Sequence, residues 1–197
     1  MFTDWLRKTF HGAIEAVAGV FNRLGLAPNA LTIIGCLMQL GVGVVLATGA
    51  LRLGGVLLAL TSVFDAFDGA LARQLGQATK FGAFLDSSLD RLSEAGVLLG
   101  LAWFYMGQPG FVEEMLIYVA IVGSLMVSYT RARAEGLGVE CKEGLFTRVE
   151  RTLVLFIGLV TGWIVPVLWL LAVGSVATAI HRMVAVYLKV RDEPLAH

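Results

Sequence analysis

Residues 65–90 read DAFDGALARQLGQATKFGAFLDSSLD, and this stretch decides the fold because it places four aspartates in a strongly apolar chain. Asp65 and Asp68 are three residues apart, and Asp86 and Asp90 are four apart. Residues with these spacings are neighbours on a helical surface, so each pair lies on one helical face. An aspartate at mid-membrane opposes insertion by roughly 2.5–3.5 kcal/mol, so four of them need compensation. The stretch therefore predicts a metal site carried by two helices.

The composition is that of a membrane protein. The chain has 197 residues, of which 57% are hydrophobic and 15% are charged, and its mean hydropathy is +0.80. Soluble domains carry about 25% charged residues, whereas bundles of membrane helices carry fewer. The formal net charge is zero, so we expect no nucleic-acid partner, and the two cysteines suggest no disulfide framework. One domain over residues 1–197 is expected.

The apolar runs predict an all-α integral membrane protein with six transmembrane helices, preceded by an interfacial amphipathic helix. The interfacial helix is expected over residues 1–25. A signal peptide is the alternative, but Glu15 and Asn22 interrupt the apolar run that it would need. A turn is expected at 51–54 and a polar loop at 132–146. The six-helix bundle occupies 30–188, with spans at 30–48, 55–75, 81–106, 111–131, 147–163 and 166–188.

The positive charges predict the orientation in the membrane. Lysines and arginines gather in the amino-terminal helix, in the loops after the second and fourth spans and in the tail. Because positive charge concentrates on the cytoplasmic side, we expect a multi-pass protein of the cell membrane with both termini in the cytoplasm. A rise of about 1.5 Å per residue places both aspartate pairs at one depth, in a site that opens to the cytoplasm.

Four carboxylates are hard oxygen ligands that suit Mg²⁺, Mn²⁺ or Ca²⁺, and two ions could divide them. Buried ion pairs with Arg73 and Arg91 are an alternative, but two arginines cannot neutralise four carboxylates. A cation transporter is another alternative from a different class of protein. It would need polar residues in the outer halves of the spans, and those halves are almost wholly apolar here.

The same stretch resembles the signature of CDP-alcohol phosphotransferases, D-x2-D-G-x2-A-R-x8-G-x3-D-x3-D. The resemblance extends to the six-span plan, to the amino-terminal helix and to the start of the first span, Pro28-Asn29-Ala30-Leu31-Thr32. It implies that a homodimer transfers a phosphatidyl-type group from a CDP-linked lipid to a hydroxyl and releases CMP. Every fixed position of the signature is met, by Asp65, Asp68, Gly69, Ala72, Arg73, Gly82, Asp86 and Asp90.

The resemblance also implies the roles of the site residues. Asp65, Asp68 and Asp86 would hold two Mg²⁺ ions, or Mn²⁺, while Asp90 would touch the second ion and act as general base on the acceptor hydroxyl. Glycines leave room for a nucleotide beside the helix backbone, although close helix packing also explains them, and an arginine offers a fork to a phosphate. The residues expected to bind the CDP-linked lipid are Pro28, Asn29, Thr32, Asp68, Gly69, Ala72, Arg73 and Gly82.

The acceptor is indicated by the run SYTRARAE at 128–135 and by cations elsewhere on the cytoplasmic side. An acceptor that carries its own phosphate needs such cations, although they also serve as topology signals. The run resembles the branch of the family that makes phosphatidylinositol phosphate or archaetidylinositol phosphate from inositol 1-phosphate. A sister transferase that uses glycerol 3-phosphate, serine or another alcohol is the alternative. The residues expected to bind the acceptor phosphate are Ser128, Arg131, Arg148, Arg151 and Arg182.

Overall fold

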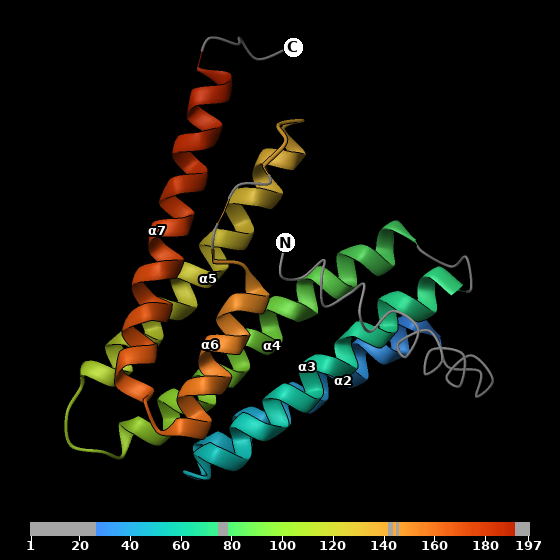
Figure 1. Cartoon of the computed structure of the whole chain (residues 1–197). Coiled ribbons are helices and arrows are strands. Elements are labelled where there is room, and N and C mark those ends of the chain that lie inside the picture. The colour runs from blue at the N-terminus through green and yellow to red at the C-terminus, as the bar shows by residue number, and fades with distance from the viewer. Residues whose placement is uncertain (1–26, 75–78, 142–143, 145, 192–197) are drawn as a thin grey trace. The chain divides into compact units, whose positions relative to one another are not determined.

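The structure is a computed structural model that describes residues 27–74, 79–141, 144 and 146–191; between 66 and 74 it describes the backbone alone. The regular elements of these residues are all helices, which confirms the all-α class (Figure 1). The expected interfacial helix at 1–25 lies outside the described residues. The helices are α2 (Pro28–Ala47), α3 (Leu51–Gln74), α4 (Lys80–Met106), α5 (Val112–Gly136), α6 (Arg148–Thr161) and α7 (Ile164–Val190).

Three of the described helices, α2, α5 and α7, are long and apolar enough to cross a membrane. The helices α3 and α4 are as long, with 24 and 27 residues, but they carry the aspartates that interrupt an apolar window. The helix α6 has 14 residues, or about 21 Å of length, against a hydrocarbon core of about 30 Å. The described helices indicate an integral membrane protein, and the six-span arrangement stays a prediction.

The expected turn at 51–54 is wrong, because the chain turns before Leu51 and α3 begins at that residue. Gly49 makes the turn with φ of +85°, a left-handed conformation that glycine adopts without steric cost. The N–H of Leu51 then donates to the carbonyl of Gly49 at 2.8 Å. Gly54 is a packing residue instead, since a Cβ at this position would overlap the side chain of Leu46.

The expected loop at 132–146 is also partly wrong, because α5 continues through its first residues and ends at Gly136. Alanine, arginine and glutamate are strong helix formers, so the run RARAE extends the helix by more than a turn. The helix stops where Gly138 takes φ of +77°, and the N–H of Val139 returns to the carbonyl of Ala134 at 2.9 Å. The whole SYTRARAE run is therefore helical.

The chain divides into two compact units, Met1–Phe104 and Tyr105–His197, and each is described by itself. In the first unit α2 contacts both α3 and α4. A Cβ on Gly43 would lie 2.6 Å from the carbonyl oxygen of Gly96, and a Cβ on Gly100 would overlap the main chain of Gly43. The backbones of α2 and α4 therefore touch at a crossing that only glycine permits.

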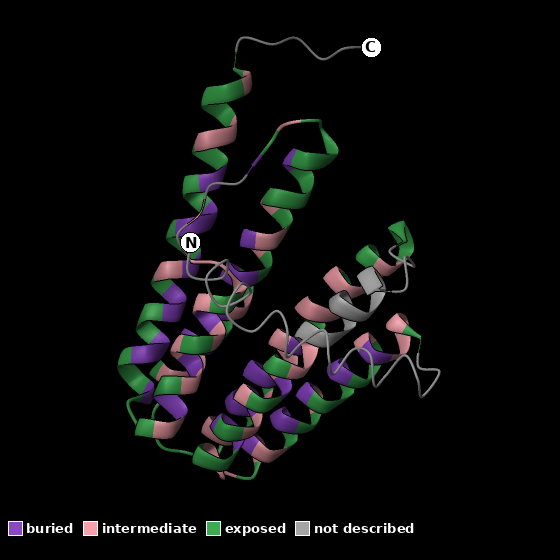
Figure 2. Cartoon of the chain, turned by 45° about the vertical axis from the view of Figure 1, so that its right-hand side comes forward, coloured by how far each residue is buried: buried purple, intermediate pink, exposed green. Residues whose placement is uncertain are grey.

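In the second unit α7 packs against α5 and α6. A Cβ on Gly123 of α5 would lie 2.8 Å from the Cβ of Ser175 on α7, so these two helices also approach closely. The buried positions of α7 recur at helical spacing, which Figure 2 shows as purple bands along the helix. The amide of Thr147 donates to the Glu150 carboxylate at 2.9 Å and caps α6. That both units form one domain over 1–197 stays a prediction.

The glycine crossing predicts that Gly100→Ala destabilises the protein by about 1–3 kcal/mol, the usual cost of overpacking. The matched control is Gly41→Ala on the exposed face of α2, where a Cβ would meet nothing within 4 Å. An alanine there should be neutral or stabilise the helix by up to about 1 kcal/mol. Thermal unfolding of the purified protein in detergent measures both effects. Equal midpoints for the two variants would contradict the backbone contact.

Candidate active site

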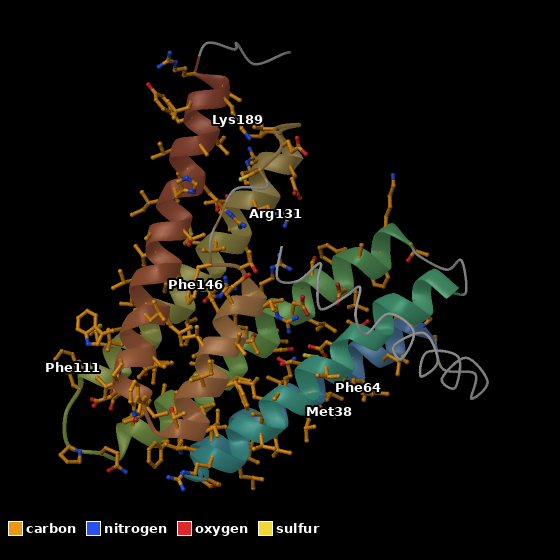
Figure 3. All side chains as sticks on the ribbon, viewed as in Figure 1. Met38, Phe64, Phe111, Arg131, Phe146 and Lys189 are labelled. Carbon is orange, nitrogen blue, oxygen red and sulfur yellow. The ribbon has the colours of Figure 1, made fainter. Side chains whose placement is uncertain are left out.

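The carboxylate of Asp65 on α3 is held against α2. The side-chain amide of Gln39 donates a hydrogen bond to Asp65 Oδ2. One turn earlier, a Cβ on Gly35 would overlap Asp65 Oδ1 and would lie 3.7 Å from Cδ1 of Phe64. Gly35 and Gln39 are four residues apart and so share one face of α2. Figure 3 labels Met38 of α2 and Phe64 of α3, which directly precede Gln39 and Asp65 in the sequence.

The other two described aspartates lie on α4. Asp86 and Asp90 are both partly buried, and their spacing places them on one helical face. The partly buried Glu94 continues that face by another turn. Sequence reasoning passed over Glu94 because it lies beyond the signature, although its four-residue spacing from Asp90 was visible. One face of α4 therefore presents three carboxylates.

The contacts of α2 show where Asp90 lies along the bundle. A Cβ on Gly82 would lie 3.1 Å from Oδ1 of Asn29, near the start of both helices. Further along, Gly43 meets Gly100, so α2 and α4 run in the same direction. Counting residues between these two contacts places Asp90 near the middle of α2, at about the level of Cys36.

The contacts of α3 place Asp65 at the same level. Asp65 of α3 contacts α2 at Gly35 and at Gln39, so it lies at the level of residues 35–39 of α2, a range that includes Cys36. Because α2 contacts both α3 and α4, positions along α2 show how far along the bundle each aspartate lies. The prediction that the two pairs lie at one depth agrees with this register for Asp65 and Asp90.

The described carboxylates have the chemistry that a hard divalent cation requires. They are oxygen donors, partly buried in an apolar unit, and the space that a Cβ on Gly35 would fill adjoins Asp65. Among the side chains that the structure describes, no three His, Cys, Asp or Glu form a group that could hold an ion. The side chains of Asp68, Ala72 and Arg73 lie outside that set, and for Gly69 the structure describes only the helical backbone, so the four-carboxylate site stays a prediction.

The residues expected to bind the CDP-linked lipid are partly brought together. Pro28 begins α2, where its fixed φ suits the first turn, and the Thr32 hydroxyl donates to the Pro28 carbonyl at 3.2 Å. Asn29 and Gly82 adjoin, as described above. Thr79 joins them, because its hydroxyl accepts the N–H of Gly82 at 2.9 Å. Sequence reasoning missed Thr79, although a threonine just before a helix is a common N-cap.

In the second unit the expected acceptor residues divide by exposure. Arg131, labelled in Figure 3, is about half exposed, and its Nε donates to Glu135 at 2.8 Å. Arg151 and Arg182 are buried, with 2% and 3% of their surface exposed. Arg151 donates to the carbonyl of Phe146 at 3.0 Å, and Arg182 donates to a carbonyl of α5. Arg151 and Arg182, two of the residues expected to bind the acceptor phosphate, therefore also form hydrogen bonds to the main chain.

These arginines form a cluster. The charges of Arg131, Arg151 and Glu135 all act on Arg182, so each of these three side chains lies within electrostatic range of the Arg182 guanidinium. Gly144 lies against the guanidinium of Arg182, since a Cβ at position 144 would lie 2.9 Å from Nε of Arg182. This proximity is consistent with the expected convergence of Arg131, Arg151 and Arg182, and their binding of a phosphate stays a prediction. Ser128 lies one turn before Arg131 on α5, and Arg148 lies one turn before Arg151 on α6.

The sequence was compared with known protein families, and the model of CDP-alcohol phosphatidyltransferases matches residues 25–188. The chain belongs to this family. It is 39% identical to the archaetidylinositol phosphate synthase of Pyrococcus horikoshii over 179 residues, which cover 90% of this chain and 93% of that protein. It is 36% identical to the phosphatidylinositol phosphate synthase of Corynebacterium glutamicum over 189 residues, which cover 90% of this chain and 85% of that protein.

Solved structures agree with this membership in the phosphatidyltransferase family. The structure of Mycobacterium tuberculosis phosphatidylinositol phosphate synthase with CDP-DAG bound matches with a TM-score of 0.88 and 29% identity, over 93% of this chain and 98% of that one. The same enzyme in complex with manganese and citrate matches with a TM-score of 0.87. The family resemblance and the enzyme class expected from the sequence, a transferase, are therefore confirmed.

In this phosphatidyltransferase the buried arginines should contribute more to stability than the exposed one. Arg182→Ala removes a charge-assisted hydrogen bond from the interior and should cost about 1.5–3 kcal/mol. Arg131→Ala removes an exposed ion pair and should cost no more than about 1 kcal/mol. The midpoint of thermal unfolding in detergent distinguishes the two variants. If both variants lost the same stability, the burial of Arg182 would have no structural role.

Proposed function

We propose that the chain transfers a phosphatidyl-type group from a CDP-linked lipid, such as CDP-diacylglycerol, to inositol 1-phosphate and releases CMP in phospholipid biosynthesis. The observation that carries this proposal is the cluster of Arg131, Arg151 and Arg182 in a chain that also bears the aspartate signature. Similarity to phosphatidylinositol phosphate and archaetidylinositol phosphate synthases along 90% of the chain supports it.

The aspartates would divide the chemistry between them. Asp65, Asp68 and Asp86 would hold two Mg²⁺ ions, for which Mn²⁺ could substitute, with Asp90 at the second. When bound, the ions supply positive charge that offsets the charge building on the departing CMP. Asp90 takes the proton of the acceptor hydroxyl, whose oxygen forms a bond to the lipid-bearing phosphorus as the bond to CMP breaks. The oxygen-donor set of the described aspartates supports this assignment.

The CDP-linked lipid would lie along the start of α2, the end of α3 and the start of α4. The close approach of Asn29 and Gly82 supports this, because a Cβ at position 82 would lie only 3.1 Å from Oδ1 of Asn29. Arg73 would reach a phosphate of the lipid, since a guanidinium fork matches phosphate oxygens. The further residues of this proposed subsite are Pro28, Thr32, Asp68, Gly69 and Ala72.

The acceptor phosphate would bind the arginine cluster together with Ser128 and Arg148. Arg131 is the exposed member and would contact the phosphate directly, while the buried pair supplies a fixed positive field. A cluster of cations recognises a phosphate rather than a neutral alcohol, so free inositol and serine are disfavoured as acceptors. Glycerol 3-phosphate carries the same charge and is the second candidate, in a sister transferase that would make phosphatidylglycerophosphate.

The arrangement in the membrane follows from the same proposal. The chain would cross the cell membrane six times after an interfacial helix, and the site would open to the cytoplasm. The arginines at the carboxyl end of α5 support that side, because positive residues concentrate in the cytoplasm. A homodimer remains the expected assembly, on the family resemblance.

A CMP-release assay with a panel of acceptors tests the proposed reaction. With CDP-diacylglycerol or its archaetidyl counterpart as donor, inositol 1-phosphate should support release of CMP, and free inositol and serine should not. A chelator should abolish release, and Mg²⁺ or Mn²⁺ should restore it, because the carboxylates need the ions. Preference for glycerol 3-phosphate would replace the proposed acceptor, and efficient transfer to free inositol would reject a phosphorylated acceptor.

Arg131→Ala tests the acceptor subsite. A charge-assisted hydrogen bond to phosphate is worth roughly 1.5–3 kcal/mol, so the KM for inositol 1-phosphate should rise about tenfold or more. The KM for the CDP-lipid should change far less. Arg133→Ala is the matched control, since Arg133 is an exposed arginine on the same helix that we leave out of the subsite. Equal rises for both substrates would assign Arg131 to the nucleotide or to the fold.

A further inference from the structure

We propose that Gln39 is a positioning residue that holds the Asp65 carboxylate in the orientation in which it binds a metal ion, and that Gly35 leaves the space this orientation needs. The inference rests on the proposed role of Asp65 as a metal ligand. It adds α2 to a site whose signature residues come from α3 and α4. Gln39 would act through Asp65 and would touch neither substrate.

The burial of Gln39 calls for an explanation. Its surface is 2% exposed, and it lies in the middle of α2, one of the helices apolar enough to cross a membrane. A buried amide is unfavourable unless it is hydrogen-bonded, and an apolar side chain would fill the same position without that cost. The hydrogen bond to Asp65 Oδ2 satisfies the amide. The polar residue therefore serves the carboxylate.

Both oxygens of the Asp65 carboxylate lie against α2. Gln39 donates to Oδ2, while Oδ1 occupies the space beside Gly35 that a Cβ would fill. The hydrogen bond at Oδ2 opposes rotation of the carboxylate about its terminal bond, and Oδ1 fits against α2 only because position 35 has no side chain. Such outer contacts orient metal ligands in proteins, and their loss typically weakens metal binding by 10- to 100-fold.

The same part of α2 also sets the position of α4. Leu40 follows Gln39, and a Cβ on Gly96 of α4 would overlap the Leu40 side chain. Through this contact and the glycine crossing, α2 brings Asp65 and Asp90 to one level. Gln39 therefore fixes the orientation of Asp65 in the helix that also fixes the height of the α4 carboxylates.

The test measures Mn²⁺ binding by the full-length protein in detergent, from the electron paramagnetic resonance signal of free Mn²⁺. Gln39→Met removes the donor at similar length, and Gly35→Ala fills the space beside Oδ1. Each should weaken Mn²⁺ affinity by about 10- to 100-fold. The matched control is Thr61→Val, since Thr61 is a buried polar residue of α3 whose hydroxyl donates to the carbonyl of Leu58 in its own helix. Its affinity should stay within about twofold of the wild type.

A second readout separates positioning from general damage. The Mg²⁺ concentration that gives half-maximal CMP release should rise in both variants, while the KM for each substrate at saturating Mg²⁺ should stay near the wild-type value. If one variant does not fold, the other decides. Wild-type Mn²⁺ affinity in a folded variant would overturn the role of Gln39 and Gly35 and leave the metal site standing. Absence of Mn²⁺ binding by the wild type would overturn the metal site itself.

Discussion

The cost of holding carboxylates inside an apolar helix bundle is the constraint on which the first unit depends. Asp65, Asp86 and Asp90 are all partly buried on α3 and α4, two helices whose remaining residues are mostly apolar. At roughly 2.5–3.5 kcal/mol per aspartate, the helices would not tolerate them without partners close at hand. At Asp65 such partners come from α2, since Gln39 donates to Oδ2 and Gly35 leaves room beside Oδ1.

Contacts at glycines determine how closely α2 approaches the helices that carry the aspartates. Gly35 admits the Asp65 carboxylate against α2, and Gly43 lets the backbone of α2 touch α4 at Gly100. Between membrane helices there is little hydrophobic driving force, so close packing of small residues must supply much of the association. The same contacts that associate the helices set their register, and the register brings Asp65 level with Asp90. The packing of the helices in this unit therefore also determines the relative positions of Asp65 and Asp90.

Sequence reasoning succeeded where the determinant is local. The spacing of the aspartates placed them on the correct helices, and most of the predicted helix ends lie within a few residues of those observed. It failed where the determinant is a tertiary contact. Gly54 looked like a turn residue, yet its role depends on Leu46 of a different helix. Likewise, the pairing of Gln39 with Asp65 joins residues 26 positions apart, and no local pattern announces it.

The three arginines of the cluster differ in exposure, since Arg151 and Arg182 are buried and Arg131 is about half exposed. Arg151 and Arg182 are fixed by hydrogen bonds to main-chain carbonyls, so their charges are oriented before any ligand arrives. Like charges held together repel one another, and the charge of Glu135 acts on Arg182 in the opposite sense to those of Arg131 and Arg151. In the proposed reaction the negative charge of the acceptor phosphate would reduce the repulsion among the arginines. Because Arg151 and Arg182 are already ordered, they would lose little side-chain freedom when the phosphate binds, which lowers the entropic cost of recognition.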